Sequence, residues 1–253
     1  MLSVLPPVTR DPRRNHLLAT LAAAELERWL PHLEPVELRL GQILFEAGVR
    51  PTHLYFPTTA ILAIVNVMED GGSAESAIIG REGLASVAVF MGGESSTERT
   101  VVLCAGSAIR VKASFLLPEF NRAGHVLQLF LRYTQALITQ MSQTVVCARH
   151  HSVEQQLCRL LLLLLDRSSD QEIIITHELI ATMLGVRREG ITEAACRLQQ
   201  LGVIRYRRGH ITVVNRQALE RRACECYAVV KREYDRLIPA PLPLQRPRLA
   251  AVS

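Results

Sequence analysis

The spacing of hydrophobic residues changes along the chain, and each change marks a different kind of element. Residues 15–30 carry apolar side chains at helical spacing, and Asn15 is placed to cap this helix. Residues 35–117 instead contain short alternating segments, such as 36–40, separated by turn-forming residues such as Asp70 and Gly71. Many short strands at regular spacing predict a β-sandwich or barrel.

Helical spacing returns at residue 113, with Pro118 near the start of a first helix and a break at 121–124. The next segment carries an apolar stripe at Leu127, Phe130, Leu131, Thr134, Leu137, Ile138, Met141, Val145 and Ala148. Ordinary packing of this helix on the chain's own β-region is the alternative. The stripe is longer than a small barrel can cover, so we expect this helix to pair with its copy in a second chain.

Residues 176–214 predict a winged helix-turn-helix. Thr176 is expected to cap a first helix, and Gly185 permits a sharp turn into a second helix that Gly202 ends. The apolar residues that these helices are expected to bury are Leu179, Ile180, Met183, Ile191, Ala194, Ala195 and Leu198. Two short strands around the basic turn 207–210 then form a wing.

The side chains expected on the outside of this unit are of the kinds that bind DNA. The second helix presents arginine, glutamate and threonine, which read base edges and phosphates in a major groove. The wing arginines are expected to contact phosphates, and His177 is expected to be exposed, either on a phosphate or as a plain surface residue. The candidate DNA-binding residues are Thr176, His177, Arg187, Arg188, Glu189, Thr192, Glu193, Arg197, Arg205, Arg207 and Arg208.

The net charge of +5 over 253 residues is unevenly distributed. Residues 1–148 carry 12 Lys and Arg against 13 Asp and Glu, whereas residues 149–253 carry 17 against 11. A basic region beside a near-neutral one favours double-stranded DNA as the partner of the C-terminal part. A solvated arginine-rich surface without a partner is the alternative.

The six cysteines form no CxxC pair, and Cys147, Cys158 and Cys196 lie on apolar helix faces, which is typical of buried thiols in a reducing compartment. Cys224 and Cys226 would need ligands from elsewhere in the chain to hold a metal, so we expect neither a metal nor a cofactor. The longest apolar run, 160–165, is too short to span a bilayer. We therefore expect a cytoplasmic protein that does not enter a membrane.

Two strings stand within the predicted helix-turn-helix: His-Glu-Leu-Ile-Ala at 177–181 and Gly-Val-Arg-Arg-Glu-Gly-Ile-Thr-Glu-Ala-Ala at 185–195. With them, residues 173–227 resemble the DNA-binding domain of the CRP/FNR superfamily of transcription regulators. Segment 41–48 is similar to the opening of that family's cyclic-nucleotide-binding-like β-roll, and the long helix resembles its dimerisation helix. The resemblance implies an α+β fold with a β-roll (jelly-roll) sensor domain over 1–123, a dimerisation helix over 124–150, a winged helix-turn-helix over 151–236 and a disordered Pro-rich tail over 237–253.

The same resemblance implies a homodimer that reads a palindromic site and works with RNA polymerase. Arg188 and Glu189 match the family's base-reading pair, so Glu189 is expected to accept a hydrogen bond from cytosine and Arg188 to contact guanine or phosphate. Glu193 stands where the family usually has an arginine. It is expected either to read cytosine or to pair with Arg197 or Arg188.

The family's cyclic-nucleotide cassette opens with Gly-Glu and closes with Arg-Ser or Arg-Thr. Here Gly80, Arg81 and Glu82 form the opening, with the glutamate displaced by one position, and Arg99 and Thr100 are the candidate closing pair. These five residues are the tentative effector site. We expect a different effector or none, because a displaced carboxylate cannot be assumed to reach the same ribose hydroxyl. A cyclic-nucleotide-responsive regulator with a rearranged pocket is the alternative.

Three other functions are less well supported by the residues. The iron–sulfur centre of some relatives needs clustered cysteines near the N-terminus, and the first cysteine here is Cys104. A cupin-type enzyme would need a His and Glu metal set on strands, whereas the β-region offers only His53, with His32 just before it. We expect no enzymatic activity. A module whose winged helix binds protein instead of DNA is the remaining alternative.

Overall fold

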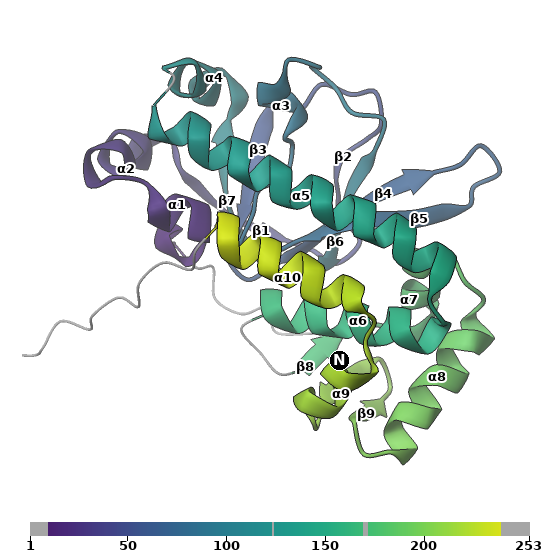
Figure 1. The fold of residues 1–253 in the computed structure, drawn as a ribbon. Coiled ribbons are helices and arrows are strands. Elements are labelled where there is room, and N and C mark those ends of the chain that lie inside the picture. Colours follow the sequence, from purple (N-terminus) through teal and green to yellow (C-terminus); the bar gives the residue numbers. More distant parts are fainter. Residues whose placement is uncertain (1–9, 123, 169–171, 239–253) are drawn as a thin grey trace, which may run out of the picture.

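A β-roll, one long helix and a group of shorter helices make up the protein, as seen in a computed structural model that describes residues 10–122, 124–168 and 172–238. Figure 1 shows helix α5 (His125–His150) crossing the whole molecule in front of the β-roll. At the other end of the molecule, beyond the β-roll, lie helices α6 (Val153–Arg167), α7 (His177–Leu184), α8 (Arg188–Gln200) and α9 (Arg216–Arg222). The expected α+β fold with a β-roll, a long helix and a C-terminal winged helix-turn-helix is confirmed.

The β-roll consists of two antiparallel sheets with the strand orders β2-β6-β4-β5 and β1-β7-β3. The strands are β1 (Glu34–Leu38), β2 (Ile43–Phe45), β3 (His53–Pro57), β4 (Ile61–Val67), β5 (Ser73–Ile79), β6 (Arg99–Cys104) and β7 (Gly106–Lys112). The expected turn at Asp70 and Gly71 joins β4 to β5, and Gly71 has the positive φ, +84°, that the turn requires. A short helix, α3 (Ala88–Met91), lies between β5 and β6.

The helix expected over residues 15–30 is two helices, α1 (His16–Thr20) and α2 (Ala23–Trp29). Asn15 caps α1 as expected, because its side-chain oxygen accepts hydrogen bonds from two N–H groups of the first turn. The expected single helix is wrong because Leu21 and Ala22 have extended backbone. The Glu25 carboxylate then accepts a hydrogen bond from the Ala22 N–H and starts α2.

Helix α4 (Ala113–Asn121) ends at the expected break, but Pro118 lies inside it rather than near its start. The apolar stripe of α5 divides between two environments. Phe130 and Leu137 are buried, with the Phe130 ring 6.2 Å from that of Phe56 in the β-roll. Leu131, Ile138 and Val145 are exposed and repeat every seven residues. The second set is available to a second chain.

The last described helix, α10 (Glu225–Leu237), follows the winged helix-turn-helix in sequence but runs alongside α5 (Figure 1). The disordered tail was expected over 237–253, but Leu237 ends α10 and both Leu237 and Ile238 are buried. The rest of the expected tail, residues 239–253, lies outside the described part of the chain. The domain boundaries drawn from the sequence stay predictions. No helix in the described ranges is long and apolar enough to cross a membrane.

Candidate nucleic-acid interface

Helices α7 and α8 meet at a left-handed glycine, as the sequence predicts. The Thr176 hydroxyl accepts a hydrogen bond from the Leu179 N–H at 3.2 Å, which caps α7. Gly185 has φ +64° at the corner, and Gly202 has φ +67° just beyond α8. The expected core residues Ile180, Met183, Ile191, Ala194, Ala195 and Leu198 are buried, and Leu179 is half-buried.

The outer face of α8 presents the expected polar side chains. Arg187, Arg188, Glu189, Thr192, Glu193 and Arg197 are all exposed. The Arg188 Nε lies 3.6 Å from a carboxylate oxygen of Glu178 on α7. In the free protein the Glu193 carboxylate lies 3.3 Å from the Arg197 guanidinium, which was one of the expected roles for Glu193. Exposed pairs of this kind are weak, so they can exchange for contacts with DNA at small cost.

The wing is a three-stranded sheet with the order β8-β10-β9, where β8 is Glu172–Ile174, β9 is Ile204–Arg207 and β10 is His210–Val213. Arg208 (φ +48°) and Gly209 (φ +85°) form the turn between β9 and β10, and two positive φ values are typical of a type I′ hairpin. Strand β8 was not predicted, because a short apolar run before a helix cap does not show its pairing partner.

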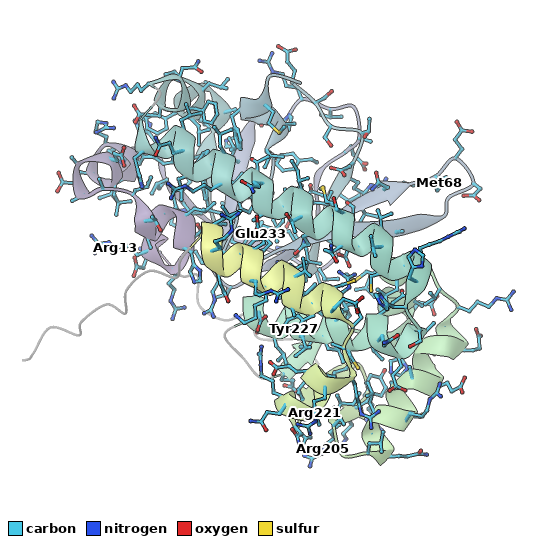
Figure 2. All side chains as sticks on the ribbon, in the orientation of Figure 1. Arg13, Met68, Arg205, Arg221, Tyr227 and Glu233 are labelled. Carbon is cyan, nitrogen blue, oxygen red and sulfur yellow. The ribbon has the colours of Figure 1, made fainter. Side chains whose placement is uncertain are left out.

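The exposed side of the wing sheet is basic. Arg205 pairs with Thr212 across the strands, and Arg207 pairs with His210, so both arginines project from one face. With Arg208 and Glu172 they line a shallow hollow of about 460 Å³. Figure 2 labels Arg205 at this end of the molecule. A strand pair that displays arginines at alternate positions is suited to a phosphate backbone.

His177 is not exposed, and the sequence-based expectation for it is wrong. Its side chain is largely buried, and its ring stacks on Tyr206 of β9 with the centroids 4.0 Å apart. Its Nδ1 lies 3.2 Å from the Thr192 hydroxyl on α8. His177 therefore joins α7, α8 and the wing, and it positions these elements.

This packing predicts a pH-dependent stability. Burial, with a smaller contribution from the charge of Arg188, lowers the pKa of His177 below its usual 6.5. The folded protein binds fewer protons there than the unfolded chain, so the stabilisation is present above about pH 6.5 and is lost as the pH falls through the folded pKa. We expect His177→Gln to reduce the loss of stability between pH 8 and pH 5.5 in urea unfolding. Equal pH dependence in wild type and His177→Gln would contradict this account.

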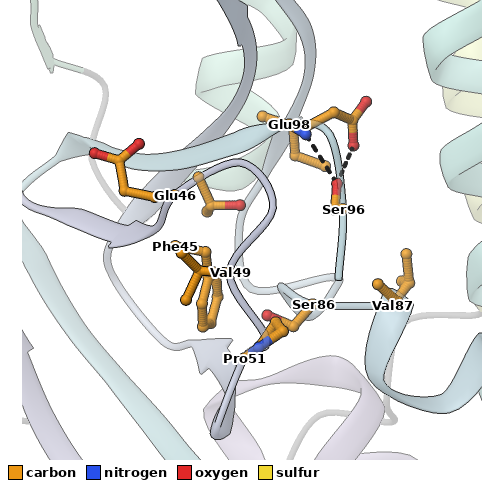
Figure 3. A pocket seen from close by; sticks show the side chains of 11 residues that line it. Phe45, Glu46, Val49, Pro51, Ser86, Val87, Ser96 and Glu98 are labelled. Atoms are coloured by element: carbon orange, nitrogen blue, oxygen red, sulfur yellow. Dashed lines mark hydrogen bonds between the residues drawn. The ribbon is translucent and has the colours of Figure 1, made fainter. Parts of the chain in front are cut away.

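The structure does not bring the five tentative effector residues into one pocket. A cavity of about 50 Å³ in the β-roll is lined by Phe45, Glu46, Val49, Pro51, Ser86, Glu98 and Thr100, among others (Figure 3). Arg99 points to Glu46, with 2.8 Å between the Arg99 Nε and the carboxylate. The described residues lining this cavity include two glutamates and no lysine or arginine. Nucleotide sites usually enclose several hundred Å³, and carboxylates repel a phosphate, so this cavity does not suit a cyclic nucleotide.

Gly80, Arg81 and Glu82 lie instead at the end of β5, against α6. The Glu82 carboxylate is 2.7 Å from the Nε of Arg167, and both side chains are largely buried. A Cβ on Gly80 would lie 2.5 Å from the Arg167 Cβ, and one on Gly83 would lie 2.5 Å from the Tyr133 ring. These glycines allow α5 and α6 to pack closely on the β-roll. The motif that resembles a nucleotide cassette therefore has a structural role here.

The burial of the cysteines differs in part from the sequence-based expectation. Cys147 and Cys158 are buried as predicted, but Cys196 is exposed on α8, because it lies one position past the apolar stripe of that helix. Cys224 and Cys226 are buried and lie close to Cys147. The sequence could not show this contact, since 77 residues separate Cys147 from Cys224.

Comparison with known proteins gives the same fold. Residues 155–222 match the Crp-like helix-turn-helix domain family. A protein of the CRP/FNR family from Eubacterium rectale is similar at 18% identity, with a TM-score of 0.63 over 81% of this chain and 96% of that one. FixK2 from Bradyrhizobium japonicum is similar at 16% identity, with a TM-score of 0.63 over 76% of this chain and 98% of that one. No curated protein sequence matches the chain.

A further solved structure with this fold is the c-di-GMP responsive global regulator CLP of Xanthomonas campestris. It is 15% identical, with a TM-score of 0.59 over 76% of this chain and 99% of that one. The chain thus shares its fold with these solved structures.

Proposed function

We propose that this chain, a CRP/FNR-type regulator by its fold and by its Crp-like helix-turn-helix domain, binds double-stranded DNA as a homodimer and reads a palindromic site. The observation that carries the proposal is the helix-turn-helix with an exposed polar face on α8 beside a basic wing. Helix α8 enters the major groove, and the wing arginines contact the backbone. The protein acts in the cytoplasm, on the cell's own DNA.

The exposed stripe of α5 supports the dimer. Leu131, Ile138 and Val145 are each about half exposed or more in the single chain, and their seven-residue repeat is that of a two-stranded coiled coil. We propose a two-fold axis along this stripe, with the two α8 helices on one side of the dimer. Two recognition helices about 34 Å apart fit two half-sites one helical turn apart.

Selection of bound sequences from random duplex DNA tests the proposal directly. The ligand-free, full-length protein is expected to enrich a palindrome whose half-site centres lie about ten base pairs apart. Enrichment without any added small molecule would support a regulator that needs no effector for binding. Absence of enrichment, both alone and with cyclic AMP or cyclic di-GMP, would overturn the proposal and favour a winged helix that binds protein.

Arg188 and Arg207 are expected to differ in what they contribute to binding. Arg188→Ala removes a side chain that lies on the base-reading face, so it should reduce discrimination among sites, at about 1–3 kcal/mol per half-site. Arg207→Ala should weaken binding to all DNA sequences alike. It should also lower the slope of log K against the logarithm of the salt concentration by about one per chain. Titrations of the selected palindrome and a scrambled duplex at several salt concentrations separate the two effects. Equal loss of specificity in both variants would contradict this division.

A further inference from the structure

Four potential metal ligands from two segments of the chain converge where α5 ends and α10 begins. Cys147 lies in the last turn of α5, His151 follows α5 directly, and Cys224 and Cys226 stand at the start of α10. Their ligand atoms all lie within 4.8 Å of one another. The three cysteines are buried, and 12% of the His151 side chain is exposed. The sequence showed only the Cys224 and Cys226 pair, and the fold supplies the other two ligands.

Two of the distances between these atoms already match those of a tetrahedral metal site. The Sγ atoms of Cys147 and Cys224 are 3.5 Å apart, and the Cys226 Sγ is 3.6 Å from the His151 Nδ1. Zinc bonds of about 2.3 Å to sulfur and about 2.0–2.1 Å to nitrogen place the ligands of a tetrahedron about 3.6–3.8 Å apart. Three sulfurs and one imidazole nitrogen form a ligand set of the kind that structural zinc sites use.

The surroundings supply the support that such a site requires. The Nδ1 of His151 faces the thiols, and its Nε2 lies 3.3 Å from the Glu225 carboxylate. A carboxylate on the far nitrogen fixes the ring orientation of metal-binding histidines. The buried Arg159 donates a hydrogen bond to the Thr144 hydroxyl at 3.2 Å, while its Nε has no hydrogen-bond partner.

Charge balance gives Arg159 a further role. Three thiolates and one divalent zinc carry a net charge of −1, and a charge of that sign is unfavourable in the protein interior unless it is paired. A buried arginine next to the thiols supplies the opposite charge. Metal binding requires deprotonated thiols, and a neighbouring cation favours that form.

We propose that Cys147, His151, Cys224 and Cys226 bind one structural zinc ion. The ion ties the start of α10 to the junction between α5 and α6, where the long helix passes into the DNA-binding part. A disulfide between Cys147 and Cys224 would use only two of the four groups and would leave the His151 and Glu225 pair unexplained. The proposal does not depend on DNA binding.

Metal analysis of the tag-free protein tests the site. Protein purified under reducing conditions without chelator is expected to contain about one zinc per chain by mass spectrometry of the elements. Cobalt substitution should give the charge-transfer and d–d bands of a tetrahedral, thiolate-rich site. X-ray absorption should show three sulfur neighbours at about 2.3 Å and one nitrogen at about 2.0–2.1 Å.

Variants test whether the zinc content depends on the four proposed ligands. Cys224→Ser should lower the zinc content to near zero, whereas Cys196→Ser, at an exposed cysteine outside the cluster, should leave it unchanged. His151→Cys keeps four ligands and should retain the metal with an altered cobalt spectrum, which guards against loss through misfolding. Wild-type protein that lacks zinc and does not take up added zinc or cobalt would overturn the proposal. A Cys147–Cys224 disulfide in freshly isolated protein would do the same.

Discussion

Replacing Ile138 with glutamate is expected to convert the proposed dimer into folded monomers. Ile138 is 54% exposed in the single chain, so the substitution should not disturb the fold of the protomer. In a two-fold interface each substitution counts twice, because the same patch occurs on both subunits. Loss of two buried isoleucines at about 1.5–3 kcal/mol each predicts a dimer dissociation constant raised by about 10² to 10⁴.

The raised dimer dissociation constant also predicts weaker binding to DNA. A monomer engages one half-site, so affinity for the full palindrome should fall together with dimerisation, while the far-UV circular dichroism stays unchanged. Sedimentation equilibrium and titration of the palindrome measure the two quantities on the same sample. Met68→Glu is the matched control, since Met68 is an exposed apolar residue in the turn between β4 and β5 and not on the α5 stripe (Figure 2). A dimeric Ile138→Glu protein would exclude this face of α5 as the seam.

The sequence predicts the helix-turn-helix well because its signals are local. The Thr176 cap, the left-handed Gly185 and the apolar spacing of α7 and α8 all act within a few residues of their effect. The exposed polar face of α8 follows from the same periodicity. These features can therefore be read without knowledge of the remaining fold.

The errors arise where a distant element decides the environment. His177 is buried because Tyr206, on a strand 29 positions later, stacks on its ring. Glu82 resembles part of a nucleotide cassette, but its partner is Arg167 on α6. The four-ligand cluster depends on α10 lying alongside α5, and no periodicity within α10 shows that contact. Tertiary packing fixes these roles, and one chain's local pattern carries no signal for them.

The Glu82–Arg167 pair makes a strong prediction of its own, because it joins the β-roll to the DNA-binding part. Arg167 is almost fully buried, lies 2.7 Å from Glu82, and donates a hydrogen bond to Gln140 of α5 at 2.5 Å. Its guanidinium also lies over the Tyr234 ring of α10, 5.2 Å from the centroid. Arg167→Met leaves the Glu82 carboxylate largely buried without its counter-ion. We expect a loss of about 3–5 kcal/mol in unfolding free energy.

The loss of unfolding free energy should appear as separate unfolding of the β-roll and of the DNA-binding part. Trp29 is the only tryptophan and is buried in the N-terminal part, so its fluorescence follows unfolding there. Far-UV circular dichroism follows mainly the helices, most of which lie outside the β-roll. In wild type the two urea transitions should coincide, and in Arg167→Met they should separate. Arg99→Met, which breaks the exposed pair with Glu46, should cost at most about 1 kcal/mol and keep the transitions together.

A double variant distinguishes the ion pair from the space that it fills. Glu82→Gln alone leaves a buried arginine without its counter-ion, so it should destabilise as Arg167→Met does. Glu82→Gln combined with Arg167→Met removes both charges and keeps similar volumes, so it should recover most of the loss. If the double variant is as unstable as the sum of the single variants, the two side chains contribute independently, and the arginine acts through its packing against Tyr234 and Gln140 and not through an ion pair with Glu82.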